Sequence, residues 1–225
     1  MNLYAVGVII QVGEGVTGVN FNDTVPYHKL GAFAEYVKVE ATALVKVLEP
    51  TPAVLPLIVC DASASLALEQ AGQMGTNDKV LVTAAAGGTG QFAVQLAKLA
   101  GNHMIGTCST DEKVAYLQTL GCDRVITYIK EDVASVLKKG YSNGLNLVFE
   151  SIGGDLLRAA VDSIALYRRI IAFGYISAYD KGDPATAAVV ITKRTSAFSK
   201  DEQISDAIDY MYTHKNVGKI VVQLV

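Results

Sequence analysis

Residues 80–90 read Val-Leu-Val-Thr-Ala-Ala-Ala-Gly-Gly-Thr-Gly, a short apolar run that breaks into a glycine-rich turn. The β-branched residues predict a strand, and residues 91–100, which end at Gly101, have the apolar spacing of a helix. A strand, a tight turn and a helix N-terminus together present backbone N–H groups and the positive end of a helix dipole to an anion. The stretch therefore predicts a site for the pyrophosphate of a dinucleotide.

The glycines match the dinucleotide fingerprint G-x-G-x-x-G incompletely. In the frame Ala85–Gly90 an alanine stands at the first glycine position. Gly87 would let the backbone approach the pyrophosphate, and Gly90 would let the helix pack closely against the strand. The strand and helix around the turn favour a dinucleotide site. The alternatives are a glycine turn without a ligand, a flavin site, and a site for a nucleotide-derived methyl donor.

Strand-like and helix-like segments alternate between about residue 62 and Phe173. At this spacing the alternation predicts an α/β fold, a doubly wound parallel sheet. The expected helices are 62–74, 91–100, 111–120, 132–138 and 156–165. The expected strands are 79–83, 104–107, 124–126, 145–149 and 169–173.

The two ends of the chain do not show this alternation of strands and helices. The first 50 residues predict a small β-rich unit, with strands at Val6–Val12, Ala32–Val39 and Leu44–Val47 between turns. Residues 185–200 are ambiguous. Asp201–Thr213 has helical spacing, and Lys219–Val225 predicts a final strand.

Composition excludes several classes of function. The 225 residues are 51% hydrophobic and 18% charged, which is enough for a sizeable core. A net charge of −3, without a basic run of interleaved aromatics, predicts no nucleic-acid partner. The 3 cysteines and 3 histidines are scattered, which indicates a reducing compartment and no metal site. No stretch approaches the roughly 20 apolar residues of a membrane span, so no membrane partner is expected.

The end of the second strand predicts which dinucleotide binds. A carboxylate that binds the ribose of NAD stands there, about 20 residues past the glycines. Here Thr107–Thr110 takes that place. Ser109 can donate a hydrogen bond to a 2′-phosphate and Lys113 adds positive charge, so NADPH is favoured over NADH. The alternative is that Ser109 only caps the next helix, in a capping box with Glu112, and that Lys113 is only solvated.

Longer stretches resemble the medium-chain dehydrogenase/reductase superfamily, in its zinc-free quinone oxidoreductase and prostaglandin reductase branch. Together they span most of residues 5–180 and 204–224. They are GAFAEYVKV from Gly31, VLVTAAAGGTGQFA from Val80, IGTCSTDEK from Ile105, LGCDR from Leu120, ESIGG from Glu150, GYISAY from Gly174 and YMYTHKNVGKIVV from Tyr210. The long central matches are specific, whereas the first alone indicates only the superfamily.

The resemblance implies a GroES-like β-rich catalytic domain around a Rossmann domain. Residues 1–61 then form a partial GroES-like domain, and 62–203 a Rossmann NADP-binding domain shortened at its C-terminal end. Residues 204–225 return to the first domain. The first part of a family member is absent, and a segment between about Phe198 and Ile204 is missing. The substrate half is therefore expected to be less complete than the cofactor half.

The resemblance also assigns residues to the cofactor. The corresponding positions are Gly87, Gly88, Thr89, Gly90, Ser109, Lys113, Tyr128, Ser151, Phe173, Tyr179 and Asn216. Thr89 corresponds to a pyrophosphate contact, and Tyr128 joins Ser109 and Lys113 at the 2′-phosphate. Ser151, Phe173 and Tyr179 fall where the family lines the nicotinamide and ribose. For Phe173 and Tyr128 the alternatives are a core side chain and a strand end.

The implied activity is NADPH-dependent reduction of the carbon–carbon double bond of an α,β-unsaturated ketone, as in 15-oxo-prostaglandin 13-reductase activity. Hydride would pass to the β-carbon of the enone and a proton to the α-carbon. A hydrogen-bond donor must stabilise the enolate, and Tyr179, a water or the cofactor ribose are the candidates. No metal is required. The alternatives are a quinone oxidoreductase, and a nucleotide-binding protein without catalysis because of the missing segments.

The expected partner is a small-molecule enone or quinone, which a lipid could supply. The family often dimerises through the edge of the Rossmann sheet, so a homodimer stays open although residues 185–203 are altered. Without a targeting signal the cytoplasm is the default location, and peroxisome and mitochondrion stay open.

Overall fold

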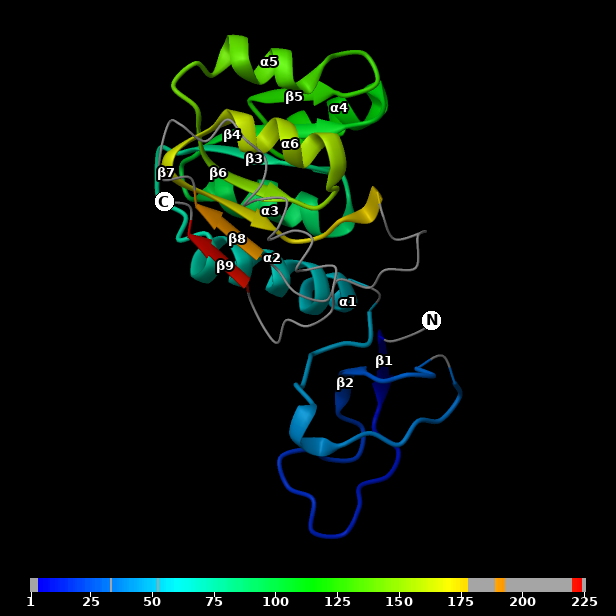
Figure 1. Cartoon of the computed structure of the whole chain (residues 1–225). Coiled ribbons are helices and arrows are strands. Elements are labelled where there is room, and N and C mark those ends of the chain that lie inside the picture. The colour runs from blue at the N-terminus through cyan, green and yellow to red at the C-terminus, as the bar shows by residue number, and fades with distance from the viewer. Residues whose placement is uncertain (1–3, 33, 52, 178–188, 193–219, 224–225) are drawn as a thin grey trace. The chain divides into compact units, whose positions relative to one another are not determined.

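The computed structural model describes residues 4–32, 34–51, 53–177, 189–192 and 220–223 (Figure 1). The chain divides into two compact units, Met1–Ser63 and Ala64–Val225. The first unit holds an antiparallel pair of strands, β1 (Tyr4–Val8) and β2 (Thr24–His28), and the short 3-10 helix η1 (Ala41–Ala43).

Two of the strands expected in the first unit do not form. The described residues of 32–39 lie in bends and irregular backbone. Leu44–Val47 contributes only a single bridge, from Val47 to Thr24. A segment with strand propensity forms a strand only where a neighbouring strand supplies hydrogen bonds. Within the described residues, β1 and β2 pair with each other.

The second unit contains a seven-stranded sheet in the order β5-β4-β3-β6-β7-β8-β9. The strands are β3 (Lys79–Val82), β4 (His103–Cys108), β5 (Arg124–Thr127), β6 (Leu145–Glu150), β7 (Ile164–Ala172), β8 (Val189–Thr192) and β9 (Ile220–Gln223). The five strands β3 to β7 pair in parallel. The predicted α/β fold with a doubly wound sheet is confirmed.

The last two strands extend this sheet. β8 pairs antiparallel with β7 and so places a strand inside the ambiguous residues 185–200. β9 pairs in parallel with β8, and the expected return of residues 204–225 to the first domain stays a prediction. Both strands are rich in Val and Ile, and the pairing gives the backbone of β8 a partner on each side. The expected helix at Asp201–Thr213 lies outside the described residues.

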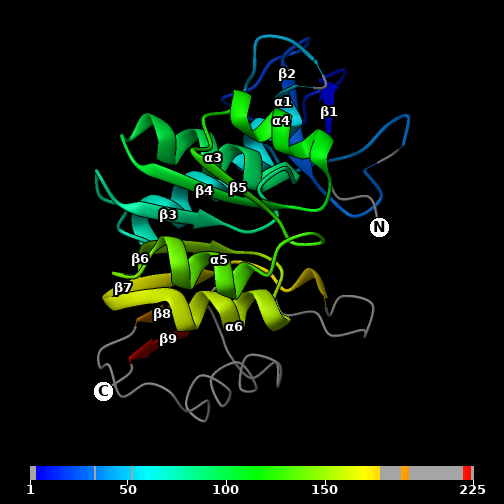
Figure 2. The same cartoon turned by 90° about the horizontal axis from the view of Figure 1, so that it is seen from above.

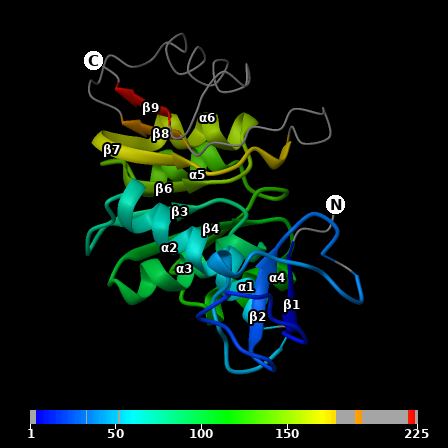
Figure 3. The ribbon, with the colours of Figure 1, turned by 90° about the horizontal axis from the view of Figure 1, so that it is seen from below.

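Helices cover both faces of the sheet (Figures 2 and 3). Helices α5 (Val133–Gly140) and α6 (Gly154–Ser163) pack on one face. The other face carries α3 (Gly88–Leu99), α4 (Asp111–Thr119) and residues of α2 (Ala62–Leu66) and η3 (Ala67–Ala71). In β3, Leu81 faces the first group while Val80 and Val82 face the second. A buried strand thus contributes to two cores, which explains apolar runs such as Val80–Val82 and Leu147–Phe149.

One continuous helical run, at residues 54–71, has an unusually apolar composition. Residues 54–71, made of α1 (Val54–Pro56), η2 (Leu57–Asp61), α2 and η3, are long and apolar enough to cross a membrane by length and composition. The sequence predicts no stretch that approaches a membrane span, and this run differs from that expectation. Ala64, Ala67 and Leu68 are buried in the core of the second unit, but only 17% of the run is buried, and the apolar side chains of Leu57, Ile58 and Leu66 are exposed.

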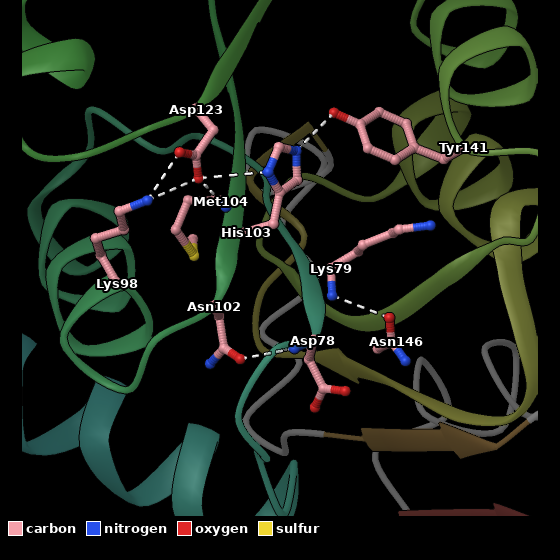
Figure 4. A network of polar contacts seen from close by, with 9 residues as sticks. All are labelled: Asp78, Lys79, Lys98, Asn102, His103, Met104, Asp123, Tyr141 and Asn146. Atoms are coloured by element: carbon pink, nitrogen blue, oxygen red, sulfur yellow. Dashed lines mark hydrogen bonds and ion pairs between the residues drawn. The ribbon is translucent and has the colours of Figure 1, made fainter.

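A polar network joins the amino ends of the parallel strands (Figure 4). Asp123 accepts hydrogen bonds from the Lys98 ammonium group at 2.8 Å and from the Met104 N–H at 2.7 Å. The Nδ1 atom of His103 lies 3.6 Å from the same carboxylate, and its Nε2 atom lies 3.2 Å from the Tyr141 hydroxyl. Asp123 therefore connects α3, β4 and the start of β5.

The substitution Asp123→Asn is expected to lower the free energy of unfolding by about 1–2 kcal/mol at neutral pH. Partial burial acts to raise the pKa of Asp123, but the Lys98 and Met104 hydrogen bonds and the Lys98 charge outweigh it and hold the pKa below 3.8. A lowered pKa means that the carboxylate stabilises the fold above the unfolded-state pKa and loses that effect as the pH falls through the folded-state value.

Urea unfolding at a series of pH values measures this. The difference between wild type and variant should shrink below about pH 4. The control Asp162→Asn removes an exposed carboxylate from α6 and should change the free energy by less than about 0.5 kcal/mol. A difference that grows in acid would contradict the prediction.

Candidate functional site

The strand order predicts the position of a ligand-binding crevice at one edge of the sheet. From β3 the chain crosses through α3 to β4 on one side, and from β5 it crosses through α5 to β6 on the other side of β3. In doubly wound sheets the ligand binds where the order reverses in this way, outside the carboxyl ends of the strands. Here that point lies between the carboxyl ends of β3 and β6. The network around Asp123 occupies the opposite edge.

The glycine turn after β3 takes a shape that only glycine permits at one position. The N–H of Gly87 donates to the carbonyl oxygen of Ala84 at 2.8 Å, and α3 begins at the next residue. A Cβ atom on Gly90 would lie 2.3 Å from the same Ala84 oxygen. Gly90 therefore lets α3 start directly against the turn, as the fingerprint predicts for its last glycine.

The alanine at the first fingerprint position is accommodated by the neighbouring strand. Ala85 is fully buried, and its N–H donates to the carbonyl oxygen of Thr107 in β4 at 3.0 Å. A Cβ atom on Gly106 would lie 3.0 Å from both the Ala85 Cβ and the Cys122 Sγ. Gly106 thus leaves the space that the Ala85 methyl group fills. Burial raises the pKa of Cys122 to about 12, so this thiol is a protonated core group and no nucleophile.

The start of α3 fits an anionic group. Gly88, Thr89 and Gly90 form its first turn, where N–H groups have no acceptor within the helix. The N-cap residue, Gly87, has no side chain that could cap them. Four of the predicted residues therefore lie together in a helix N-terminus that could hold a pyrophosphate through N–H groups and the helix dipole.

Ser109 and Lys113 lie together beyond β4. The Lys113 ammonium group donates to the Ser109 hydroxyl at 3.2 Å. The capping box with Glu112 is wrong, because α4 begins at Asp111 and its N-cap is Thr110, without a side-chain cap. Ser109 is thus free of the capping role. Asp111, the nearest carboxylate along the chain, forms an ion pair with Lys130.

The other predicted residues follow neighbouring strands. Tyr128 follows β5, is 44% exposed, and its N–H donates to the Cys108 carbonyl oxygen at 3.1 Å. Phe173 follows β7, and its ring stacks on the buried Phe149 with centroids 4.8 Å apart. Phe173 is partly buried against the core of the second unit, at the carboxyl edge of the sheet, and its role at the nicotinamide stays a prediction.

Ser151 follows β6, between the ends of β3 and β7. Its N–H donates to the Thr83 hydroxyl at 2.8 Å. Tyr179 and Asn216, the remaining predicted residues, lie outside the described residues. Within the part of the chain that the structure describes, no three His, Cys, Asp or Glu side chains gather in a group that could hold a metal ion.

Sequence reasoning missed a buried carboxylate at the centre of this edge. Glu150 ends β6 and is 0% exposed. Its carboxylate accepts hydrogen bonds from the N–H groups of Ile152 and Gly153 and from the Thr83 hydroxyl. Burial raises the pKa of Glu150 above 4.5, although these three donors act in the opposite direction. The available signal was a charged residue directly after the apolar run Leu147–Phe149.

Comparison with known proteins identifies relatives along the whole chain. A family model of zinc-binding dehydrogenases matches residues 88–210. Prostaglandin reductase-3 of Mus musculus is 38% identical over 97% of this chain and 71% of its own length. A probable quinone oxidoreductase of Leishmania amazonensis is 32% identical over 98% of this chain and 78% of its own length. These relatives confirm the predicted resemblance.

A solved structure shares the fold. A mycobacterial protein complexed with NADPH superimposes with a TM-score of 0.72 at 22% identity, over 99% of this chain. This chain spans 63% of that protein. The alignment with prostaglandin reductase-3 runs over 269 positions, more than the 225 residues here, so the relative carries residues inside the matched region that this chain lacks.

Proposed function

Because the chain belongs to the zinc-binding dehydrogenase family of the medium-chain dehydrogenase/reductase superfamily, we propose that it is an NADPH-dependent reductase of α,β-unsaturated ketones. The observation that carries this proposal is at the carboxyl edge of the sheet, where an uncapped helix N-terminus follows β3 and the Ser109–Lys113 pair follows the adjacent strand β4. Prostaglandin reductase-3 supports the reaction class, and the mycobacterial protein of the same fold was solved with NADPH.

In this proposal each group of residues has one task. The N–H groups of Gly88–Gly90 bind the pyrophosphate, and Ser109 and Lys113 bind the 2′-phosphate, with Tyr128 beside them. The nicotinamide half then lies toward β6 and β7, bordered by Ser151 and Phe173. NADPH, when bound, supplies the hydride that reduces the double bond. Tyr179, a water or the cofactor ribose is the donor to the enone oxygen, and Asn216 is a further cofactor contact.

Turnover tests the proposal directly. We expect purified chain to oxidise NADPH when a 15-oxo-prostaglandin or a simple enone is added, with one saturated ketone formed per NADPH. The matched control is the same ketone without the double bond, which should leave NADPH unchanged. Enone-independent oxidation of NADPH, or no binding of NADPH at all, would overturn the proposal.

A quinone oxidoreductase is the second candidate, and the relative from Leishmania amazonensis favours it. In the same assay a quinone would then consume NADPH while enones would not. Binding of NADPH without turnover of either substrate would instead indicate a nucleotide-binding protein without catalysis. The chain lacks residues that prostaglandin reductase-3 has inside the matched region, and their absence could abolish turnover while NADPH binding is kept.

A further inference from the structure

Glu150 links three segments at the carboxyl edge of the sheet. Its Oε1 atom accepts from the Thr83 hydroxyl at 3.2 Å, from the Ile152 N–H at 2.8 Å and from the Gly153 N–H at 3.0 Å. Its main-chain oxygen accepts from the Phe173 N–H at 2.7 Å. One residue therefore ties the end of β3, the turn after β6 and the end of β7 together.

Thr83 completes this arrangement from the other side of the crevice. It directly follows β3, is 1% exposed, and begins the path to the glycine turn. Its hydroxyl donates to Glu150 and accepts from the Ser151 N–H at 2.8 Å. The hydroxyl therefore binds both the carboxylate and the turn that the carboxylate holds, and the Phe149 main-chain oxygen, at 3.5 Å, is a second and longer acceptor.

The turn itself has a backbone shape that needs support. Gly153, the N-cap of α6, has φ 78° and ψ −166°, a region open essentially to glycine alone. A buried carboxylate is also costly unless its acceptors are satisfied, and an apolar side chain of similar volume would avoid that cost. The two features together point to a requirement for one fixed shape of the Ser151–Gly153 turn.

We propose that Glu150 is a positioning residue, which with Thr83 fixes the Ser151–Gly153 turn where the nicotinamide half of the dinucleotide binds. The inference rests on the proposed function only for the identity of the ligand. A dinucleotide spans the crevice. With the pyrophosphate at α3 and the 2′-phosphate beyond β4, its remaining half faces the turn after β6.

The test compares two ligands that differ only at this end. NADPH contains the nicotinamide, and 2′-phospho-ADP-ribose lacks it. We expect Glu150→Leu to weaken NADPH about tenfold or more while the affinity for 2′-phospho-ADP-ribose changes less than about twofold. Glu150→Gln keeps an acceptor oxygen and should retain most of the NADPH affinity. Equal weakening of both ligands, or no weakening of NADPH, would overturn the proposal.

A second pair of variants covers the case in which Glu150→Leu fails to fold. Thr83→Val removes only the hydroxyl, and Thr83→Ser retains it as the matched control. We expect Thr83→Val to weaken NADPH selectively and to speed amide hydrogen exchange at Ser151 and Ile152, with Thr83→Ser close to wild type. Unchanged exchange in Thr83→Val would overturn the proposal without any cofactor present. If the chain binds NADPH but turns over no substrate, only the proposed enzyme function is overturned, and the proposal for Glu150 is not.

Discussion

The substitution Gly90→Ala is expected to weaken NADPH binding on the order of 100-fold and to lower the free energy of unfolding by about 1–3 kcal/mol. The added Cβ would lie 2.3 Å from the Ala84 oxygen and 3.0 Å from the Ala84 carbonyl carbon. Both are backbone atoms, so no side chain can rotate away to relieve the contact. Either the turn or the start of α3 must move, and the N–H groups that face the pyrophosphate move with it.

Alanine substitutions at two other glycines should have smaller effects on NADPH binding and stability than Gly90→Ala. A Cβ on Gly87 would lie 3.0 Å from the Ala84 oxygen, so Gly87→Ala should be milder. A Cβ on Gly140, at the end of α5, would meet nothing within 4 Å, and Gly140→Ala serves as the control. Denaturant unfolding and fluorescence titration with NADPH measure both quantities. Wild-type affinity in Gly90→Ala would show that the turn after β3 does not bind the cofactor.

The second large effect is expected from Lys113→Ala, which should weaken NADPH about 10- to 100-fold and leave NADH nearly unchanged. Lys113 is exposed, and its ammonium group lies 3.2 Å from the Ser109 hydroxyl. A 2′-phosphate beside this pair would receive a charged and a neutral hydrogen bond. NADH has no phosphate at that position and therefore no contact to lose.

Lys139→Ala is the matched control, because it removes an exposed charge from the end of α5, away from the ends of β4 and β5. It should change neither affinity by more than about twofold. Ser109→Ala should weaken NADPH less than Lys113→Ala, since it removes only a neutral donor. Equal losses of NADPH and NADH in Lys113→Ala would contradict the assignment of the 2′-phosphate.

The five parallel strands β3 to β7 could be predicted because their signals are local, whereas β8 lies in residues that the sequence leaves ambiguous. Each buried strand is apolar on both faces, and each glycine turn or helix start follows it within a few residues. The strands of the first unit could not be predicted in the same way. Ala32–Val39 contains strand-favouring residues such as Tyr36, Val37 and Val39, but their propensity contains no information on whether a partner strand lies beside them.

For the candidate site too, features set by one short segment could be predicted, and features that join distant segments could not. The glycine turn and the Ser109–Lys113 pair each come from one short segment, so sequence spacing located them. The capping box failed because α4 starts two residues after Ser109 rather than at the next residue. Glu150 was missed because Thr83, its partner across the crevice, is distant in the sequence. Only the pairing of β3 with β6 brings the two together.

The contact between Ala85 and Gly106 changes how the dinucleotide fingerprint should be searched for. Read along one segment, the motif here is one glycine short. Across the two paired strands the glycine count is complete, because Gly106 in β4 provides the space that Ala85 takes up. At this position the motif therefore depends on the volume between the turn after β3 and the adjacent strand β4. A search that scores both strands jointly would recover chains that a linear pattern rejects.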